Sequence, residues 1–195
     1  MKIDALEKKI KEEFSEIKTR IINDQYLQLK VSEKDLVPFL RRMKRDYGFI
    51  HLSAISCVDW IEDNQFELSY HIWSYQHKIL IDADVRIDRE KAEFDSVIDL
   101  YHPAKFFERD IYEFFGVTFR GNDDMNKFIL TDWDGIPPLR KDFITRKYAL
   151  ENFSWREYQP DWAKNFGLSA KTLNNYMPES FKELCLKKDE EEENK

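Results

Sequence analysis

Four charged side chains stand among aromatic residues in the segment FFERDIYEFFG, residues 106–116. Glu108, Asp110 and Glu113 could serve as general acid and base, because burial among phenylalanine rings raises the pKa of a carboxyl group toward neutrality. The adjacent Arg109 instead favours the ionised carboxylate, and it is spaced to pair with Glu113 across one helical turn. No arrangement of serine, cysteine or histidine typical of a nucleophile accompanies them. Two interpretations stay open: a catalytic carboxylate pair, and a charge cluster that fixes a loop or a partner chain.

Histidines offer a second candidate site. If the strand runs over 66–77, His71 and His77 point the same way, which permits a metal site with Asp82 or Asp84 nearby. The sequence has no HExxH or comparable ligand spacing, and it lacks the GxGxxG and GxxxxGKS/T loops that cradle phosphates. Satisfied or exposed histidines are the simpler interpretation, so we expect no metal and no cofactor in this chain.

The composition is that of a folded, acidic protein. Of its 195 residues, 42% are hydrophobic and 35% are charged, which supplies enough apolar area for one core of ordinary size. The formal net charge of −7 argues against general nucleic-acid binding, because phosphate contacts need a basic face. The two cysteines, Cys57 and Cys185, are too few and too far apart to ligate zinc or an iron–sulfur cluster alone. No apolar run approaches the roughly 20 residues of a membrane span, and the charged N-terminal segment lacks a signal-peptide pattern, so we expect neither export nor a transmembrane helix.

The first quarter of the chain alternates between helical and extended patterns. A stripe of apolar residues at spacings of three and four predicts an amphipathic helix over residues 3–21. Alternation in YLQLKV predicts a strand at 26–31. Ser32 opens the sequence SEKD, where its hydroxyl is placed to accept a free N–H at the start of a second helix that ends at Gly48. The stripe of the first helix consists of Ile3, Leu6, Ile10, Phe14, Ile17 and Ile21.

Three strands are predicted next, at about 49–60, 66–76 and 79–87, and their short connections favour antiparallel hairpins. In the third strand five apolar residues share one face and three charged residues share the other, so we expect one buried and one solvated face. The order of elements predicts an α+β fold: a largely antiparallel sheet with helices packed on one face, followed by an extended C-terminal tail. The apolar residues of the third strand are Ile79, Ile81, Ala83, Val85 and Ile87, and the charged ones are Asp82, Asp84 and Arg86.

The segment with the charge cluster is predicted to be a helix at 104–115, with Pro103 entering it and Gly116 ending it. The last forty-odd residues carry many aromatic side chains without a sustained period and finish in the charge run KKDEEEENK. We therefore predict two regions. A globular domain covers 1–147, and an extended tail at 148–195 docks on partner chains or on its own domain and has a solvated, disordered acidic end.

Two ordered motifs carry a resemblance to a known family. The first is the charge cluster with the residues that follow it, and the second joins ILTDWDG at 129–135 to PLRKDF at 138–143. Together they resemble the family of the 30 kDa subunit of NADH:quinone oxidoreductase, respiratory complex I, and the resemblance covers roughly residues 30–147. The residues that carry it are Glu108, Arg109, Asp110, Glu113, Phe115, Gly116, Phe119, Asp132, Gly135, Pro138, Leu139, Arg140, Lys141 and Asp142.

The resemblance implies a subunit of an oxidoreductase complex that has no catalytic centre and no cofactor of its own. It implies a place in the peripheral arm of a membrane-bound, ion-translocating complex, on the cytoplasmic side of the cell membrane, attached to the membrane only through partner subunits. The implied partners are the large hydrogenase-like or quinone-site subunit, near the terminal iron–sulfur cluster, and a small iron–sulfur subunit. Iron–sulfur clusters, with or without a nickel–iron centre, would then lie in those partners.

The chain also departs from the pattern of this family. It has Gly121-Asn122-Asp123 and the segment 135–139, GIPPL, where the family commonly has Gly-His-Pro. These departures favour a parent complex such as an energy-converting membrane-bound hydrogenase, a sulfur-reducing complex, or a ferredoxin- or coenzyme-F420-linked enzyme, in place of an NADH:quinone reductase. Two alternatives from other classes stay open: a stand-alone hydrolase that uses the carboxylates of the charge cluster, and a soluble regulatory module whose tail recognises a peptide.

Overall fold

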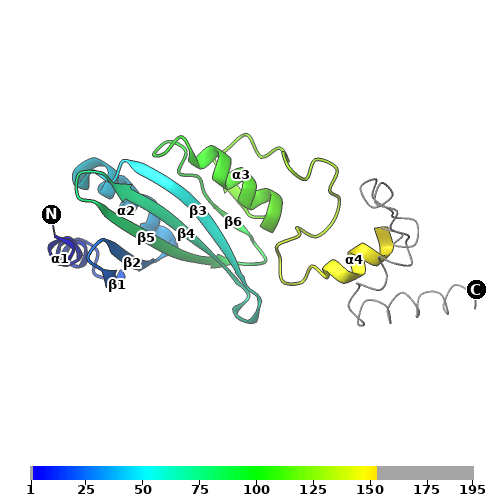
Figure 1. The fold of residues 1–195 in the computed structure, drawn as a ribbon, viewed down its shortest axis with the longest axis horizontal. Coiled ribbons are helices and arrows are strands. Elements are labelled where there is room, and N and C mark those ends of the chain that lie inside the picture. Colours follow the sequence, from blue (N-terminus) through cyan, green and yellow to red (C-terminus); the bar gives the residue numbers. More distant parts are fainter. Residues whose placement is uncertain (1, 153–195) are drawn as a thin grey trace, which may run out of the picture. The chain divides into compact units, whose positions relative to one another are not determined.

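The computed structural model describes residues 2–152 of the chain (Figure 1). The chain divides into two compact units, Met1–Phe143 and Ile144–Lys195. The described part of the second unit is α4 (Thr145–Asn152), so the first five residues of the predicted tail are helical, and the remainder of that tail lies outside the described residues. The first unit contains α1 (Ile3–Glu13), β1 (Lys18–Asn23), β2 (Tyr26–Val31), α2 (Glu33–Tyr47), β3 (His51–Trp60), the 3-10 helix η1 (Ile61–Asp63), β4 (Gln65–Ser74), β5 (Ile79–Asp88), β6 (Glu93–Asp95), α3 (Ala104–Phe115) and β7 (Thr118–Arg120).

Five strands form one sheet in the order β1-β2-β5-β4-β3, while β6 and β7 form a separate parallel pair. The pairs β1/β2, β5/β4 and β4/β3 are antiparallel, and β2 and β5 run parallel. The parallel pair arises because α2, β3 and β4 intervene in the chain between β2 and β5, which allows β5 to return in the direction of β2. The predicted α+β fold with a largely antiparallel sheet is confirmed.

In the first unit, helices α1, α2 and α3 and one face of the sheet enclose a single apolar core. The helix α1 contacts β1 and β2, α2 contacts β5, and α3 contacts β3. Every second side chain of β4 is buried, and all five apolar residues predicted for the inner face of the third strand are buried as expected. The largest fully buried side chains include Tyr70, Phe39, Phe49, Phe66 and Phe119.

The predicted N-terminal helix is too long by two turns. Helix α1 ends at Glu13, and the last two members of the apolar stripe, Ile17 and Ile21, lie before and within β1. Because Thr19 and Ile21 pair with Leu29 and Leu27 of β2, the backbone of this segment finds its hydrogen-bond partners in a hairpin, which β-branched residues favour. Ile17 is buried from an extended segment, so it continues the helical spacing without being helical.

The boundaries of α2 follow from local chemistry, with one correction. Gly48 ends the helix at φ +69°, a conformation that glycine adopts readily, as predicted. Ser32 occupies the N-cap position, but its side chain caps no backbone N–H. The Ser32 hydroxyl instead donates to the Asp35 carboxylate at 2.5 Å, because that acceptor lies one turn further along the helix.

The predicted solvated face of the third strand is wrong for two residues. Asp82 is 7% exposed and Asp84 is 5% exposed, since polar side chains of neighbouring strands cover them. Asp82 accepts a hydrogen bond from the Tyr26 hydroxyl, and Asp84 accepts one from the Gln28 side-chain amide at 2.9 Å. The outer face of the sheet therefore carries a connected polar layer in which carboxylates are buried by their own hydrogen-bond donors.

Candidate functional site

Helix α3 buries the first carboxylate of the charge cluster, Glu108, completely. One oxygen of Glu108 accepts hydrogen bonds from the Ser96 hydroxyl at 2.7 Å and the Asn122 side-chain amide at 2.9 Å, and the other accepts one from the backbone N–H of Val97 at 2.9 Å. Burial raises the pKa of Glu108, and these three donors oppose the rise. Glu108 therefore ties the segment before α3 to the segment after β7, and one of its donors, Asn122, lies where the chain departs from the family pattern.

The second buried carboxylate, Glu113, binds the loop that follows β7. It is 2% exposed, and one of its oxygens accepts hydrogen bonds from the backbone N–H groups of Phe128, at 3.1 Å, and Leu130. The predicted ion pair between Arg109 and Glu113 is absent from residues 2–152, because the backbone of the loop takes the carboxylate instead. The other oxygen, Oε2, is buried without a hydrogen-bond partner among those residues.

Arg109 and Asp110 complete the cluster but lie differently. The guanidinium of Arg109 stacks on the rings of Phe106 and Phe128, with 5.5 Å and 4.8 Å from its central carbon to the ring centroids. Asp110 is half-buried, and its pKa is raised. Burial is the main cause, the charge of Glu113 adds to the rise, and the charge of Arg109 opposes it. Since Glu108 and Glu113 are each occupied by loop donors, the arrangement gives no support to a catalytic carboxylate pair.

A second buried charge cluster holds the other family motif, PLRKDF. Asp59 of β3 accepts a bidentate pair from Arg89, Nε at 2.7 Å and Nη2 at 2.9 Å, and a hydrogen bond from the backbone N–H of Lys141 at 2.8 Å. Arg89 also contacts Asp142 at 3.0 Å. Burial disfavours the charge of Asp59, but the hydrogen bonds from Arg89 and Lys141 outweigh it and keep the pKa of Asp59 below its ordinary value. Neither Asp59 nor Arg89 was predicted from the sequence, because they stand 30 residues apart and outside both motifs.

Arg140 does not make the bidentate pair for which its side chain is suited. Its guanidinium stacks on the ring of Phe66 at 5.4 Å, and Nε lies 3.4 Å from Asp142. The bidentate role falls to Arg89, which stacks on the same ring at 5.6 Å. Two arginines therefore share one aromatic surface at the point where the loop meets the sheet.

Gly116 lets the same loop approach the end of α3. It adopts φ +79°, and a Cβ atom at this position would lie 3.1 Å from Pro137 Cγ. The backbone N–H of Leu139 donates to the carbonyl oxygen of Phe114 at 3.1 Å. Only a residue without a side chain permits both the turn and the close packing of the loop.

The remaining motif residues divide into buried and exposed sets. Phe119 is buried in β7, and Phe115 packs its edge on Phe66 with 6.2 Å between the ring centroids. The structure thus brings the α3 end of the first motif next to the second motif at Phe66. The half-buried or exposed members are Asp132, Gly135, Pro138, Leu139 and Lys141.

His71 lies beside Asp82, one of the two aspartates expected near it, and forms a hydrogen-bond chain that also includes Ser56. Its Nδ1 lies 2.5 Å from Asp82 Oδ1, and its Nε2 lies 2.9 Å from Ser56 Oγ. The order Ser–His–Asp is that of a nucleophilic triad; the three side chains lie on the neighbouring strands β3, β4 and β5, and the hydrogen bond to Asp82 raises the pKa of His71. Within the described residues no group of three or more His, Cys, Asp or Glu side chains is placed to hold a metal, so the metal hypothesis gains no support.

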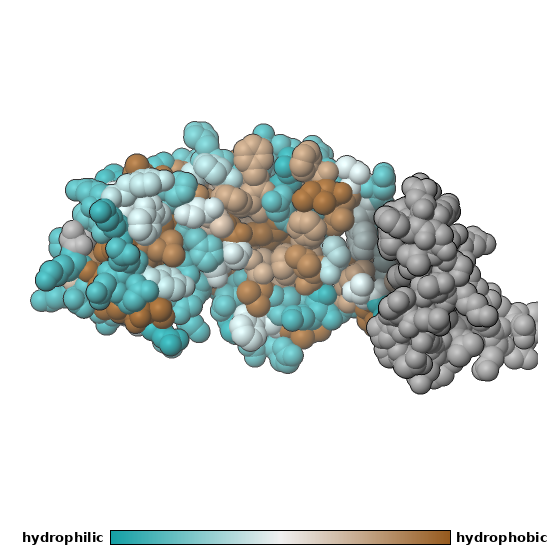
Figure 2. Space-filling model, viewed as in Figure 1, coloured by the Kyte–Doolittle hydropathy of each residue, from teal (hydrophilic) through white to brown (hydrophobic). Residues whose placement is uncertain are grey.

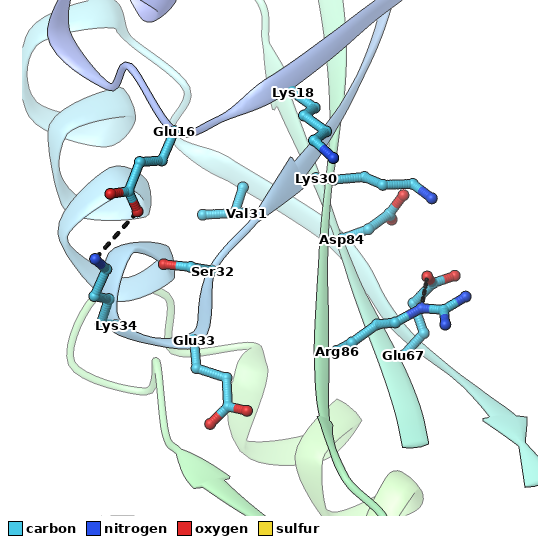
Figure 3. Close-up of a pocket in the computed structure, with 10 residues that line it drawn as sticks. All are labelled: Glu16, Lys18, Lys30, Val31, Ser32, Glu33, Lys34, Glu67, Asp84 and Arg86. Carbon is cyan, nitrogen blue, oxygen red and sulfur yellow. Dashed lines mark hydrogen bonds and ion pairs between the residues drawn. The ribbon is translucent and has the colours of Figure 1, made fainter. Parts of the chain in front are cut away.

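A shallow groove lies apart from both motifs (Figure 3). It measures about 800 Å³ and is lined by β1, β2, the start of α2 and the outer face of β4 and β5. Four acidic and four basic side chains line it, and several of them pair, including Lys34 with Glu16 at 3.1 Å and Arg86 with Glu67 at 3.0 Å. None of the described residues that line this groove belongs to either family motif.

Known proteins are similar to this chain in sequence and in fold. Residues 29–149 match the family described as respiratory-chain NADH dehydrogenase, 30 Kd subunit. The chain is 34% identical over 102 residues to an F(420)H(2) dehydrogenase subunit of Methanosarcina mazei, covering 52% of this chain and 65% of that protein. It is 34% identical over 153 residues to an NADH-quinone oxidoreductase subunit of Rickettsia felis, covering 76% and 73%. A chain in the structure of the membrane-bound sulfane sulfur reductase, an archaeal respiratory membrane complex, is 31% identical and aligns with a TM-score of 0.73 over 81% of this chain and 95% of its own length.

Fold and motifs together define an α+β protein of the kind found in respiratory oxidoreductases. This chain belongs to the 30 kDa subunit family of the respiratory-chain NADH dehydrogenase, complex I. The resemblance stated from the motifs is confirmed over nearly the same residues. The relatives include F(420)H(2) dehydrogenase and sulfane sulfur reductase subunits as well as NADH-quinone oxidoreductase subunits. Among residues 2–152, no helix has the length and apolar character required to cross a membrane.

Proposed function

We propose that this chain is a non-catalytic subunit in the peripheral arm of a complex I-type oxidoreductase, and that it docks on the large hydrogenase-like or quinone-site subunit near the terminal iron–sulfur cluster. One observation carries the proposal. Buried carboxylates fix the loops of both motifs: Glu108 and Glu113 of the first motif accept hydrogen bonds from backbone N–H groups, and Asp59, which lies outside the motifs, accepts one from Lys141 of the second. Charges that hold a surface in one shape serve recognition and leave no free acid–base pair.

The surface held in this way exposes several large apolar side chains. Hydrophobic residues gather on the face of the molecule over α3 and the segment that follows it (Figure 2). Monomeric proteins rarely leave large apolar patches in water, and such patches mark interaction sites. Exposed large hydrophobic side chains of α3 and of residues 121–143 are Phe106, Phe128, Ile129, Ile136 and Leu139.

The proposal extends to partners, cofactors and location. The small iron–sulfur subunit is the second partner, and iron–sulfur clusters, with or without nickel–iron, lie in the partners and not in this chain. Membrane attachment is indirect, on the cytoplasmic side. The relatives of this chain are subunits of multi-subunit respiratory enzymes, which supports a hetero-oligomeric assembly here as well.

The parent complex is proposed to be a relative of the quinone reductases. Similarity to an F(420)H(2) dehydrogenase subunit and to a chain of a sulfane sulfur reductase complex supports an F420- or sulfur-linked enzyme, while the hydrogenase- and ferredoxin-linked forms rest on the departures from the family pattern alone. Neither the hydrolase nor the regulatory-module alternative gains support from these relatives.

The test is purification of the native complex through an affinity tag on this chain. We expect the large subunit and the small iron–sulfur subunit to be recovered with it at equal stoichiometry, and the isolated chain to contain no iron, nickel or flavin. Recovery of the chain without either subunit would end the proposal. Hydrolytic turnover by the isolated chain that disappears in Glu113→Gln would favour the hydrolase instead.

A further inference from the structure

We propose that Arg109 is the anchor with which this chain binds a carboxylate of the large partner subunit. The inference rests on the proposed function and deepens it, because it names the chemistry of the contact. In this inference the residues of the charge cluster have different roles. Glu108 and Glu113 hold the surface in shape, and Arg109, which lies between them in the sequence, binds the partner.

Arg109 is held in a fixed position by two aromatic rings. Its guanidinium lies 5.5 Å from the centroid of Phe106, one turn earlier on α3, and 4.8 Å from that of Phe128 in the loop. The loop ring is in place because the backbone N–H of Phe128 donates to Glu113. Contact with two rings restricts the motion of the guanidinium and so reduces the entropy lost when it binds an anion.

The guanidinium has unused hydrogen-bonding capacity. Within residues 2–152 no hydrogen bond or ion pair reaches it, and its Nε is buried without a partner. The charge of Arg109 lowers the pKa of two acidic side chains of the same chain, Asp110 and Asp124. Asp124 pairs with Lys105 at 3.0 Å, so this loop carboxylate is already engaged elsewhere. A buried donor without an acceptor is costly, and a partner carboxylate would satisfy it.

The surroundings match the anatomy of a protein interface. Phe106 is 54% exposed and Phe128 is 67% exposed, although both are large apolar rings. Arginine and aromatic residues dominate the energetics of interfaces, where apolar contacts exclude water from a central charge. Charge complementarity therefore specifies the occupant: a segment of the large subunit that presents Asp or Glu among apolar side chains.

Zero-length cross-linking tests the contact directly. A water-soluble carbodiimide joins amines to carboxylates and leaves guanidinium groups unreacted. The native complex is purified with Arg109→Lys in this chain, treated, digested and analysed by mass spectrometry. We expect an amide between position 109 and an Asp or Glu of the large subunit, absent from the wild-type complex. The link between Lys105 and Asp124 of the same chain serves as the internal control for the reagent.

Two variants that each replace an arginine by an uncharged glutamine measure how much Arg109 contributes to binding of the large subunit. Arg109→Gln should lower recovery of the large subunit about tenfold, since removing one member of a desolvated charge pair weakens binding strongly. Arg41→Gln removes the same charge from an exposed position on α2 and should leave recovery unchanged. Both isolated variants should melt within a few degrees of the wild type, which separates loss of binding from loss of folding.

The outcomes distinguish this inference from the proposed function. Two outcomes would overturn the role of Arg109 and leave the proposed function intact. One is equal recovery of the large subunit by the wild-type chain and by Arg109→Gln. The other is a cross-link from position 109 only to carboxylates of its own chain. If the wild-type chain recovers no large subunit, both proposals fail together.

Discussion

The carboxylate of Glu113 accepts a hydrogen bond from the backbone N–H of Phe128 at 3.1 Å, across 15 residues of sequence. Through this contact, Glu113 of α3 holds the backbone of the loop at Phe128 in place. The contact from the N–H of Val97 to Glu108 does the same for the segment on the other side of α3. The two buried glutamates of this helix therefore hold the segments on either side of it in place.

Replacing Glu113 should release the loop before it affects the core. Glu113→Ala leaves the N–H groups of Phe128 and Leu130 without an acceptor and should cost about 2–3 kcal/mol, whereas Glu113→Gln retains an acceptor oxygen and should cost about 1 kcal/mol. Hydrogen exchange of these two amides is the measurement, and both should exchange faster in the alanine variant. Unchanged protection would show that the loop is held by other contacts.

The buried pair of Asp59 and Arg89 should dominate the attachment of the PLRKDF loop. Asp59→Asn removes the buried, bidentate counter-charge of the Arg89 guanidinium and leaves only the exposed Asp142, so we expect a loss of about 3–5 kcal/mol in unfolding free energy. Denaturant titration measures this. Arg120→Gln is the control, because its pairs with Glu93 and Asp95 are exposed and should contribute less than about 1 kcal/mol. Equal losses for the two variants would contradict the assignment.

Gly116 should tolerate a side chain less well than Gly121. Both adopt positive φ, +79° and +94°, but a Cβ atom at Gly116 would meet Pro137 at 3.1 Å while one at Gly121 would meet Ser96 at 3.7 Å. Alanine should cost about 1 kcal/mol at either site through backbone strain, with a further loss at Gly116 from displacement of the loop. Thermal melts of the two variants should separate by several degrees, Gly116→Ala melting lower.

His71 should make stability depend on pH. The hydrogen bond to Asp82 raises the pKa of His71 above its ordinary 6.5, so the stabilisation is fully present below that value and is lost as pH rises through the folded-state pKa. Relative to His71→Gln, the wild type should gain about 1–2 kcal/mol at pH 5.5 and progressively less toward pH 9. Unfolding free energies of both proteins across this range supply the check. A difference that grows with pH would refute the assigned direction.

The exposed apolar residues should matter for assembly and not for folding. Leu139 is 53% exposed, so Leu139→Ser should change unfolding free energy by less than about 0.5 kcal/mol and yet reduce recovery of the large subunit. Ile50→Ser, at a residue 61% exposed between α2 and β3, is the matched control and should leave recovery intact. Equal recovery for both variants would place the docking surface elsewhere.

The sequence by itself determined the elements whose residues meet neighbours close in the chain. The helix at 104–115, its end at Gly116 and the three antiparallel strands are encoded in local periodicity and turn residues, and two dense motifs sufficed for the family. Local pattern failed where pairing partners decided the outcome. Ile21 continues a helical stripe but lies in a strand, since the hairpin with β2 satisfies its backbone.

Only the tertiary structure decided what the charged residues bind. Asp59 meets Lys141 across 82 residues, and Asp82 meets Tyr26 across 56. No periodicity records such contacts, because a carboxylate takes whichever donors the fold brings within about 3 Å of it. The sequence therefore shows which residues are charged. Only the packing of helix, sheet and loop determines which donors the buried carboxylates bind, and so which parts of the fold they hold together.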